Sequence, residues 1–215
     1  MLIDRMRNAI YDIIYPPGLV CACCLREAVV RENGLCEECD SGLEAFNAAP
    51  LIKNTEGFTA ALIYNDVSGR MIKNLKYNGK RWLAPVLAGF IQLPDEWRID
   101  AVVPVPLYKK RQRERGFNQS ELIAKSLCER YGLMLEASLL KRVVDTDTQT
   151  RRSGAARRNA LKKAFSADEA CRGLIVLLVD DVRTTGSTLY ECASALKLSG
   201  CKAVYAVTVC FAKDN

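Results

Sequence analysis

The sequence contains no histidine among its 215 residues. This absence excludes catalysis by an imidazole base and metal sites with imidazole ligands. No apolar run approaches the roughly 20 residues that a membrane-spanning helix requires. Residues 1–16 also lack the charged start, apolar core and small-residue cleavage site of a signal peptide. We therefore expect a cytoplasmic protein that does not associate with membranes.

The composition is that of an ordinary globular protein, with 49% hydrophobic and 26% charged residues. A chain of this length can hold one sizeable α/β domain and a small appendage. We predict that residues 1–50 form an N-terminal helix and a cysteine-rich ribbon. Apolar residues at helical spacing between Leu2 and Ile14 indicate the helix, and two prolines at 16 and 17 end it. Residues 51–215 would form the main domain.

Four of the ten cysteines form two Cys-x-x-Cys pairs, Cys21 with Cys24 and Cys36 with Cys39. Eleven residues separate the pairs, a spacing typical of a zinc ribbon with four thiolate ligands. Four protein ligands leave no position for water, so we expect a structural Zn²⁺. Cys23 is a fifth thiol, either spare or an alternative ligand to Cys24. The remaining cysteines are predicted to be small buried residues: Cys128, Cys171, Cys192, Cys201 and Cys210.

The net charge of +6 is unevenly distributed. Thirteen of the 31 basic residues fall within residues 109–115 and 141–163, which favours a polyanionic partner such as pyrophosphate or nucleic acid. A solvated surface is the alternative. The first stretch and its flanks offer only Tyr108 and Phe117 for stacking on bases, which weakens the case for direct recognition of single-stranded DNA.

Residues 174–188 are the most informative stretch. Leu174 to Val179 predict a buried strand of a parallel sheet, which ends at Asp180 and Asp181. A turn rich in hydroxyl groups and a helix follow, an arrangement that directs backbone N–H groups and the helix dipole at a phosphate. Carboxylates just before such a turn can accept hydrogen bonds from the vicinal hydroxyls of a sugar. The predicted ligand is a sugar phosphate, with its diol on the two acids and its phosphate on Thr184, Thr185, Gly186, Ser187 and Thr188.

The rest of the main domain alternates strands and helices. We predict strands over 58–64, 99–103 and 201–211, and expect residues 161–165 to return the chain to the sheet. Helices are predicted over about 81–92 and 120–131, and from Asp66 or Ser68 as the cap to Tyr77. Lys76, near the end of that helix, would face either the ligand or solvent. Pro104 and Pro106 end the second strand and lead into a basic loop.

The stretch from Asp180 to Thr188 resembles the 5-phosphoribosyl-1-pyrophosphate (PRPP) signature of type I phosphoribosyltransferases. The whole chain resembles the ComF family of bacterial phosphoribosyltransferase-like proteins. Six further features carry this resemblance: a Tyr-Pro-Pro segment before the cysteines, the paired Cys-x-x-Cys, Leu75-Lys-Tyr77, Pro104-Val-Pro106, Arg115-Gly-Phe-Asn-Gln119 and the stretch from Gln149 to Asn159. The chain departs from the pattern at Arg183, which adds positive charge near the phosphate, and at the extra Cys23.

The resemblance implies a type I phosphoribosyltransferase fold, an α/β fold with a parallel sheet flanked by helices and the ligand at the carboxyl ends of the strands. It also implies Mg²⁺ bridging pyrophosphate and ribose hydroxyls near Asp180 and Asp181, and a pyrophosphate loop at Leu107, Tyr108 and Lys109. The expected reaction transfers phosphoribosyl from PRPP to a nitrogen acceptor and releases pyrophosphate.

Catalytic candidates under this resemblance are the two acids together with Arg152 and Arg158, which lie in a polar stretch over 144–160 where the family has a mobile loop. No residue is an obvious general base. Some family members are linked to natural competence, so two alternatives remain. The chain could bind PRPP or a nucleotide without catalysis, or it could contact proteins or single-stranded DNA of the DNA-uptake apparatus. The sequence predicts neither the acceptor nor the oligomeric state.

Overall fold

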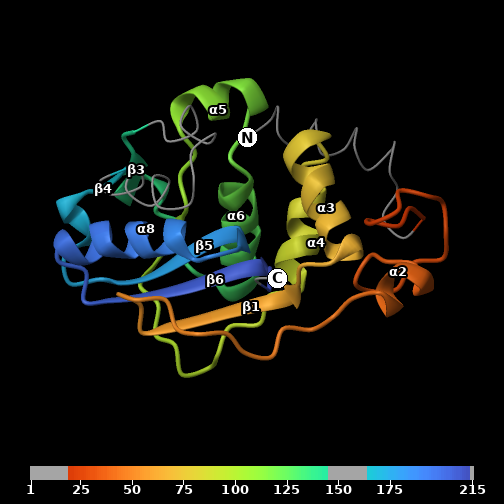
Figure 1. The fold of residues 1–215 in the computed structure, drawn as a ribbon, viewed down its shortest axis with the longest axis horizontal. Coiled ribbons are helices and arrows are strands. Elements are labelled where there is room, and N and C mark those ends of the chain that lie inside the picture. Colours follow the sequence, from red (N-terminus) through yellow and green to blue (C-terminus); the bar gives the residue numbers. More distant parts are fainter. Residues whose placement is uncertain (1–18, 145–163, 214–215) are drawn as a thin grey trace.

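The computed structural model describes residues 19–144 and 164–213, and its centre is a parallel sheet (Figure 1). The strand order is β1-β6-β5-β2, and each neighbouring pair is parallel. Parallel neighbours require crossover connections, which helices provide here. This architecture confirms the predicted α/β class. The strands are β1 (Gly57–Ile63), β2 (Ala101–Pro104), β5 (Ile175–Arg183) and β6 (Ala203–Phe211).

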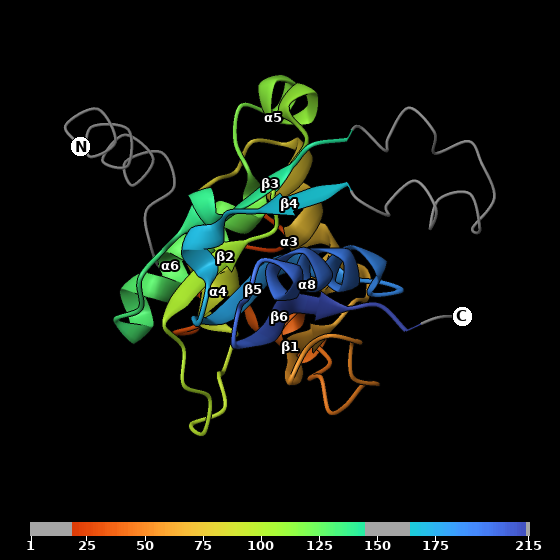
Figure 2. The same ribbon diagram turned by 90° about the vertical axis from the view of Figure 1, so that its left-hand side faces the viewer.

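Helices cover both faces of the sheet. Helices α3 (Asp66–Tyr77), α4 (Leu83–Gly89) and α6 (Gln119–Tyr131) pack on one face, and α8 (Ser187–Leu198) packs on the other (Figure 2). Side chains of a strand alternate between faces, so Leu177 and Val179 join the core beneath α3, α4 and α6, whereas Val176 and Leu178 join the core beneath α8. Within the described residues, no helix is both long and apolar enough to cross a membrane.

The N-cap of helix α3 lies one residue before the first of the two predicted caps. Asn65 is the N-cap and accepts hydrogen bonds from the backbone N–H groups of Val67 and Ser68, while the Ser68 hydroxyl accepts one from the Asn65 N–H. This reciprocal capping box satisfies N–H groups that the first turn of a helix leaves free. The prediction of Asp66 or Ser68 as the cap was therefore wrong, although the helix itself is confirmed.

Two elements differ from the predicted pattern. The basic stretch after the second strand is a helix, α5 (Lys109–Arg115), rather than a loop. Strand β4 (Phe165–Ala167) does not return to the main sheet but pairs antiparallel with β3 (Leu140–Arg142). The Phe165 side chain is buried in the core beneath α8, which anchors this ribbon beside the sheet. Short 3₁₀ turns flank the ribbon, at η1 (Ala137–Leu139) and η3 (Glu169–Cys171).

The cysteine-rich segment packs against α3 and α4. Cys21, Cys23 and Leu35 are fully buried in the same core as Met71 and Leu87 of these helices. A short helix, α2 (Glu37–Ser41), begins within the second cysteine pair, with Cys36 as its N-cap and Cys39 inside it. The proposed boundary near residue 50 remains a prediction, and the predicted N-terminal helix lies outside the described residues.

Candidate functional site

The turn between β5 and α8 is built around one glycine. Strand β5 does not end at the acidic pair as predicted but continues to Arg183, and Gly186 is the N-cap of α8 with φ +76°. A Cβ atom at Gly186 would lie 3.3 Å from Nε of Arg183 and 3.6 Å from Cγ1 of Ile52. Both the left-handed backbone and the close packing therefore require glycine. The N–H groups of the first turn of α8 have no partner within the helix, and one of them, that of Ser187, donates to the Thr185 hydroxyl at 3.4 Å.

Hydroxyl groups lie around this turn, as the sequence indicated. Thr184 and Thr185 are exposed, and Ser187 and Thr188 are half-buried at the start of α8. The hydroxyl oxygens of Thr185 and Ser187 are 2.9 Å apart and share a hydrogen bond. The turn therefore combines backbone donors, hydroxyl donors and the positive end of a 12-residue helix.

Arg183 places a positive charge beneath the turn. Its side chain is buried, and its guanidinium carbon lies 4.3 Å from the ring centroid of Phe58 and 5.4 Å from that of Phe211. Cation–π contacts of this kind stabilise a buried guanidinium. The sequence showed that a cation stands close to the turn, and the structure shows which rings hold it.

Asp180 is held by a serine from a distant helix. Asp180 is 9% exposed, and its Oδ1 accepts hydrogen bonds from the Ser120 hydroxyl at 2.7 Å and from the Asp181 N–H at 2.9 Å. Burial, and then the charge of Asp181, raise the pKa of Asp180 to about 7, because the hydrogen bonds that favour the carboxylate only partly offset them. Asp180 is thus poised to exchange a proton near neutral pH.

Asp181 is paired with a lysine from α3. The Lys76 ammonium forms an ion pair with Oδ2 of Asp181, and the two side chains are 20% and 5% exposed. Burial lowers the pKa of Lys76, but the charges of Asp181 and Asp180 outweigh it, so the pKa is raised overall. Sequence left Lys76 open between the site and solvent. The structure brings it to the acidic pair.

The segment Arg115 to Ser120 connects these features. Gly116, with φ +78°, ends α5, and the side chain of Asn118 caps α6 by accepting from the Ser120 N–H. The same Asn118 amide donates to the carbonyl oxygen of Val105 at 3.1 Å. These contacts fix the start of α6 against the end of β2, and they bring the Ser120 hydroxyl to Asp180.

The residues predicted to receive pyrophosphate follow β2 directly. The Val105 N–H donates to the Val179 carbonyl oxygen, so the end of β2 lies beside the acidic end of β5. Leu107 and Tyr108 are half-buried, and Lys109 is exposed as the first residue of α5. The predicted pyrophosphate and ribose residues therefore share the carboxyl edge of the sheet, where α/β proteins bind ligands. Arg152 and Arg158 lie outside the described residues.

A second candidate site lies in the cysteine-rich segment. The sulfur atoms of Cys21, Cys24, Cys36 and Cys39 are all within 4.8 Å of one another. Tetrahedral Zn–S bonds of about 2.3 Å separate sulfurs by about 3.8 Å, so this set fits a four-thiolate metal ion. Burial raises the pKa of the Cys21 thiol, but hydrogen bonds from backbone N–H groups, first that of Cys36, outweigh burial and lower the pKa to about 7. Burial, and then hydrogen bonds with Cys36 and Cys23, raise the pKa of Cys39 above its ordinary value, so a metal ion must displace that proton when it binds.

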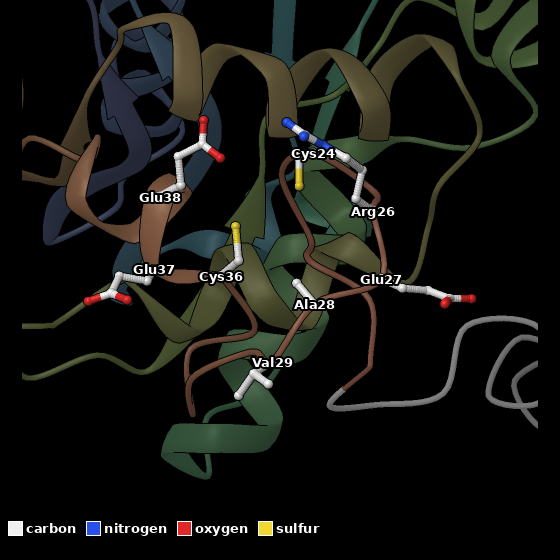
Figure 3. A pocket seen from close by; sticks show the side chains of 8 residues that line it. All are labelled: Cys24, Arg26, Glu27, Ala28, Val29, Cys36, Glu37 and Glu38. Carbon is white, nitrogen blue, oxygen red and sulfur yellow. The ribbon is translucent and has the colours of Figure 1, made fainter.

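The fifth thiol belongs to the core rather than to this set. Cys23 is fully buried and its Sγ donates to the Val67 carbonyl oxygen at 3.6 Å. Figure 3 shows the sulfurs of Cys24 and Cys36 facing the same pocket of about 520 Å³, with Arg26 beside Cys24. The structure therefore groups Cys24, and not Cys23, with the other three cysteines.

Comparison with known proteins identifies the relatives of this chain. No protein-family model matches it. The DNA utilization protein YhgH of Salmonella typhimurium is 30% identical over 211 residues, covering 89% of each chain. Competence protein F of Haemophilus influenzae is 30% identical over 209 residues, covering 84% of this chain and 91% of that protein. The chain belongs to the ComF family.

Two proteins of Bacillus subtilis show more distant similarity. Competence protein ComFC of Bacillus subtilis is 25% identical to this ComF-family chain over 192 residues, covering 85% of it and 73% of that protein. A structure of glutamine PRPP amidotransferase from Bacillus subtilis, in complex with ADP and GMP, covers 59% of this chain and 25% of its own. Its sequence identity is 22% and its TM-score is 0.39.

Proposed function

We propose that this ComF-family protein binds PRPP at the carboxyl edge of its sheet and transfers the phosphoribosyl group to a nitrogen acceptor. The observation that carries the proposal is the convergence of three elements on this edge. The Gly186 turn precedes α8, the acidic pair lies just upstream on β5, and the basic segment after β2 lies beside it. The three parts of PRPP match these elements in the same order: the 5-phosphate matches the turn, the ribose diol the acidic pair, and the pyrophosphate the basic segment.

Each part of PRPP has a proposed place. The 5-phosphate binds residues 184–188, where backbone and hydroxyl donors can replace its hydration shell. The ribose diol donates to the acidic pair, and since Lys76 holds Oδ2 of Asp181, a hydroxyl must bind the other oxygen or displace the ammonium. Pyrophosphate binds at residues 107–109, where Lys109 supplies positive charge.

The reaction breaks the bond between ribose C1 and pyrophosphate and forms a bond between C1 and the acceptor nitrogen, which then loses a proton. We propose that positive charge at Lys109 stabilises the leaving pyrophosphate. The predicted arginines, Arg152 and Arg158, would add to it. One oxygen of each acid is already engaged, Oδ1 of Asp180 by the Ser120 hydroxyl and Oδ2 of Asp181 by the Lys76 ammonium, and that ammonium would repel a divalent ion. Mg²⁺ would therefore enter with pyrophosphate rather than reside on the acids.

The metal that we infer at the four cysteines is zinc. Thiolates select Zn²⁺ over oxygen-seeking ions, and four protein ligands indicate a structural role. The thiol Sγ of Cys21 accepts a hydrogen bond from the Cys36 N–H at 3.4 Å, a contact that would persist with a metal-bound thiolate. Metal analysis of purified protein tests this inference, with one zinc per chain as the expected result.

Calorimetric titration of PRPP into zinc-loaded protein, with and without Mg²⁺, tests the proposed function. Binding should be lost in Asp181→Asn and in Gly186→Ala. Gly173→Ala is the matched control, because Gly173 also has a positive φ, +77°, but lies away from the turn, and a Cβ atom there would meet no atom of the described residues within 4 Å. Pyrophosphate release on adding ammonia or amines would show catalysis. Unchanged PRPP affinity in both site variants would overturn the assignment.

A role in DNA uptake is the second candidate, and α5 favours it. Residues 109–114 are exposed, and the helix carries five basic side chains and one acidic one. The relatives are named for competence and DNA utilization. Single-stranded DNA should then bind, and its affinity should fall as the salt concentration rises. In a plot of the logarithm of the association constant against the logarithm of the salt concentration, the slope should be about −0.7 for each phosphate that the protein neutralises. Stacking adds little, because Phe117 is buried beneath the Arg81 guanidinium.

A further inference from the structure

The acidic pair is already supplied with a cation from the protein itself. Lys76 reaches Asp181 from α3, 105 residues earlier in the chain, and its ammonium pairs with Oδ2 of a side chain that is only 5% exposed. Lys73, one turn earlier on α3, is exposed. The helix thus places one of its two lysines in the site and the other in solvent.

We propose that Lys76 acts as the built-in cation of the acidic pair, positioning Asp181 and excluding divalent cations from the pair until a ligand brings one. The inference concerns this chain's own residues, and its role in catalysis rests on the proposed function. Two carboxylates at the end of one strand would otherwise attract a divalent ion, since oxygen ligands of this kind suit Mg²⁺ and Mn²⁺.

The geometry gives Lys76 an advantage over a metal ion. Its neighbour Leu75 is fully buried in the core beneath α3, which fixes the end of the helix against the sheet. The fold therefore holds the ammonium close to Asp181, whereas an ion bound from solution would lose translational entropy. A divalent ion approaching Oδ2 would meet a like charge at contact distance in a site with little solvent, where repulsion is strong.

The second acid is also held by groups of the protein itself. Oδ1 of Asp180 accepts from the Ser120 hydroxyl and from the Asp181 N–H, and its pKa of about 7 leaves the carboxyl partly protonated at neutral pH. With one acid neutralised by Lys76 and the other held by two donors, the pair presents hydrogen-bond acceptors to a ribose diol rather than a charged cage to a cation. Lys76 is a positioning residue in this account.

The test measures Mn²⁺ binding by the loss of the free-ion EPR signal, in zinc-loaded protein and without PRPP. Wild-type protein should bind no Mn²⁺ at the acidic pair. Lys76→Gln should gain one site per chain, at least about tenfold tighter than any wild-type binding, and Lys76→Arg should restore the wild-type result. Adding Asp181→Asn to Lys76→Gln should remove the new site. Lys73→Gln, with the same change of charge on the exposed face, should gain none.

Two results would overturn the proposal. One is a folded, zinc-loaded Lys76→Gln protein that gains no Mn²⁺ site. The other is Mn²⁺ binding by the wild-type protein that is absent from the Asp181→Asn variant. This second comparison does not need Lys76→Gln to fold. Because the assay contains no PRPP, its failure is separate from the failure of the proposed function, which the PRPP titration measures.

Discussion

Asp180 should make the folded protein less stable as the pH rises through neutrality. Its pKa is raised from 3.8 to about 7, first by burial and then by the charge of Asp181. The folded state therefore holds this proton more tightly than the unfolded chain does. The stabilisation is complete below about pH 4, the pKa in the unfolded chain, and is lost as the pH rises through about 7.

The magnitude follows from the size of the shift. One pKa unit corresponds to about 1.4 kcal/mol, so the interval from 3.8 to about 7 corresponds to roughly 4 kcal/mol. Between pH 5 and 8.5, where zinc thiolates persist, the expected loss is about 3 kcal/mol.

Asp180→Asn isolates this effect. The amide has the size of the carboxyl and keeps an oxygen that can accept from Ser120 and from the Asp181 N–H, but it does not titrate in this range. Urea unfolding between pH 5 and 8.5 gives the free energy of unfolding of the wild type and of Asp180→Asn. In the difference between the two, the contributions of the titrating groups that both proteins share cancel. Asp95→Asn, an exposed site, controls for the change in net charge.

The difference should grow in favour of Asp180→Asn as the pH rises. A constant difference across the range would mean that the pKa of Asp180 is not raised in the folded state, and would refute the assigned role of burial.

Three further outcomes are expected. Cys24→Ser should reduce bound zinc well below one per chain in a colorimetric zinc assay, whereas Cys23→Ala should retain it and lose only about 1 kcal/mol of stability. Ser120→Ala should cost roughly 1.5–3 kcal/mol in chemical unfolding at pH 8, where Asp180 is charged, and a smaller effect at pH 8 than at pH 5 would contradict this. Gly186→Ala and Gly173→Ala should each lose about 1–2 kcal/mol from a strained backbone, but only the former should lose PRPP affinity.

Local sequence patterns predicted most of the main sheet. Six apolar residues followed by Asp180 and Asp181 indicated a buried strand, and the residues after them indicated a glycine turn and a helix, all of which the structure contains. The paired cysteines were equally informative, because their spacing alone brings four sulfurs together. Patterns of this kind depend on residues that lie close together in the sequence.

Contacts between distant segments could not be predicted in the same way. Ser120 is 60 residues from Asp180 and Lys76 is 105 residues from Asp181, and neither partner differs locally from other serines or lysines on a helix. The signal available for Ser120 was its place directly after the Arg115 to Gln119 motif. Helix α5 was missed because its seven residues have no apolar face, so the periodicity that identifies a helix is absent.

The central claim is that the phosphate of PRPP binds the backbone of the turn before α8. Hydrogen–deuterium exchange of the zinc-loaded protein measures that backbone directly. PRPP should slow exchange over residues 184–190 and 105–109, ribose 5-phosphate should slow it over 184–190 alone, and neither should change the cysteine-rich segment. Unchanged exchange over 184–190 at saturating PRPP would contradict the account.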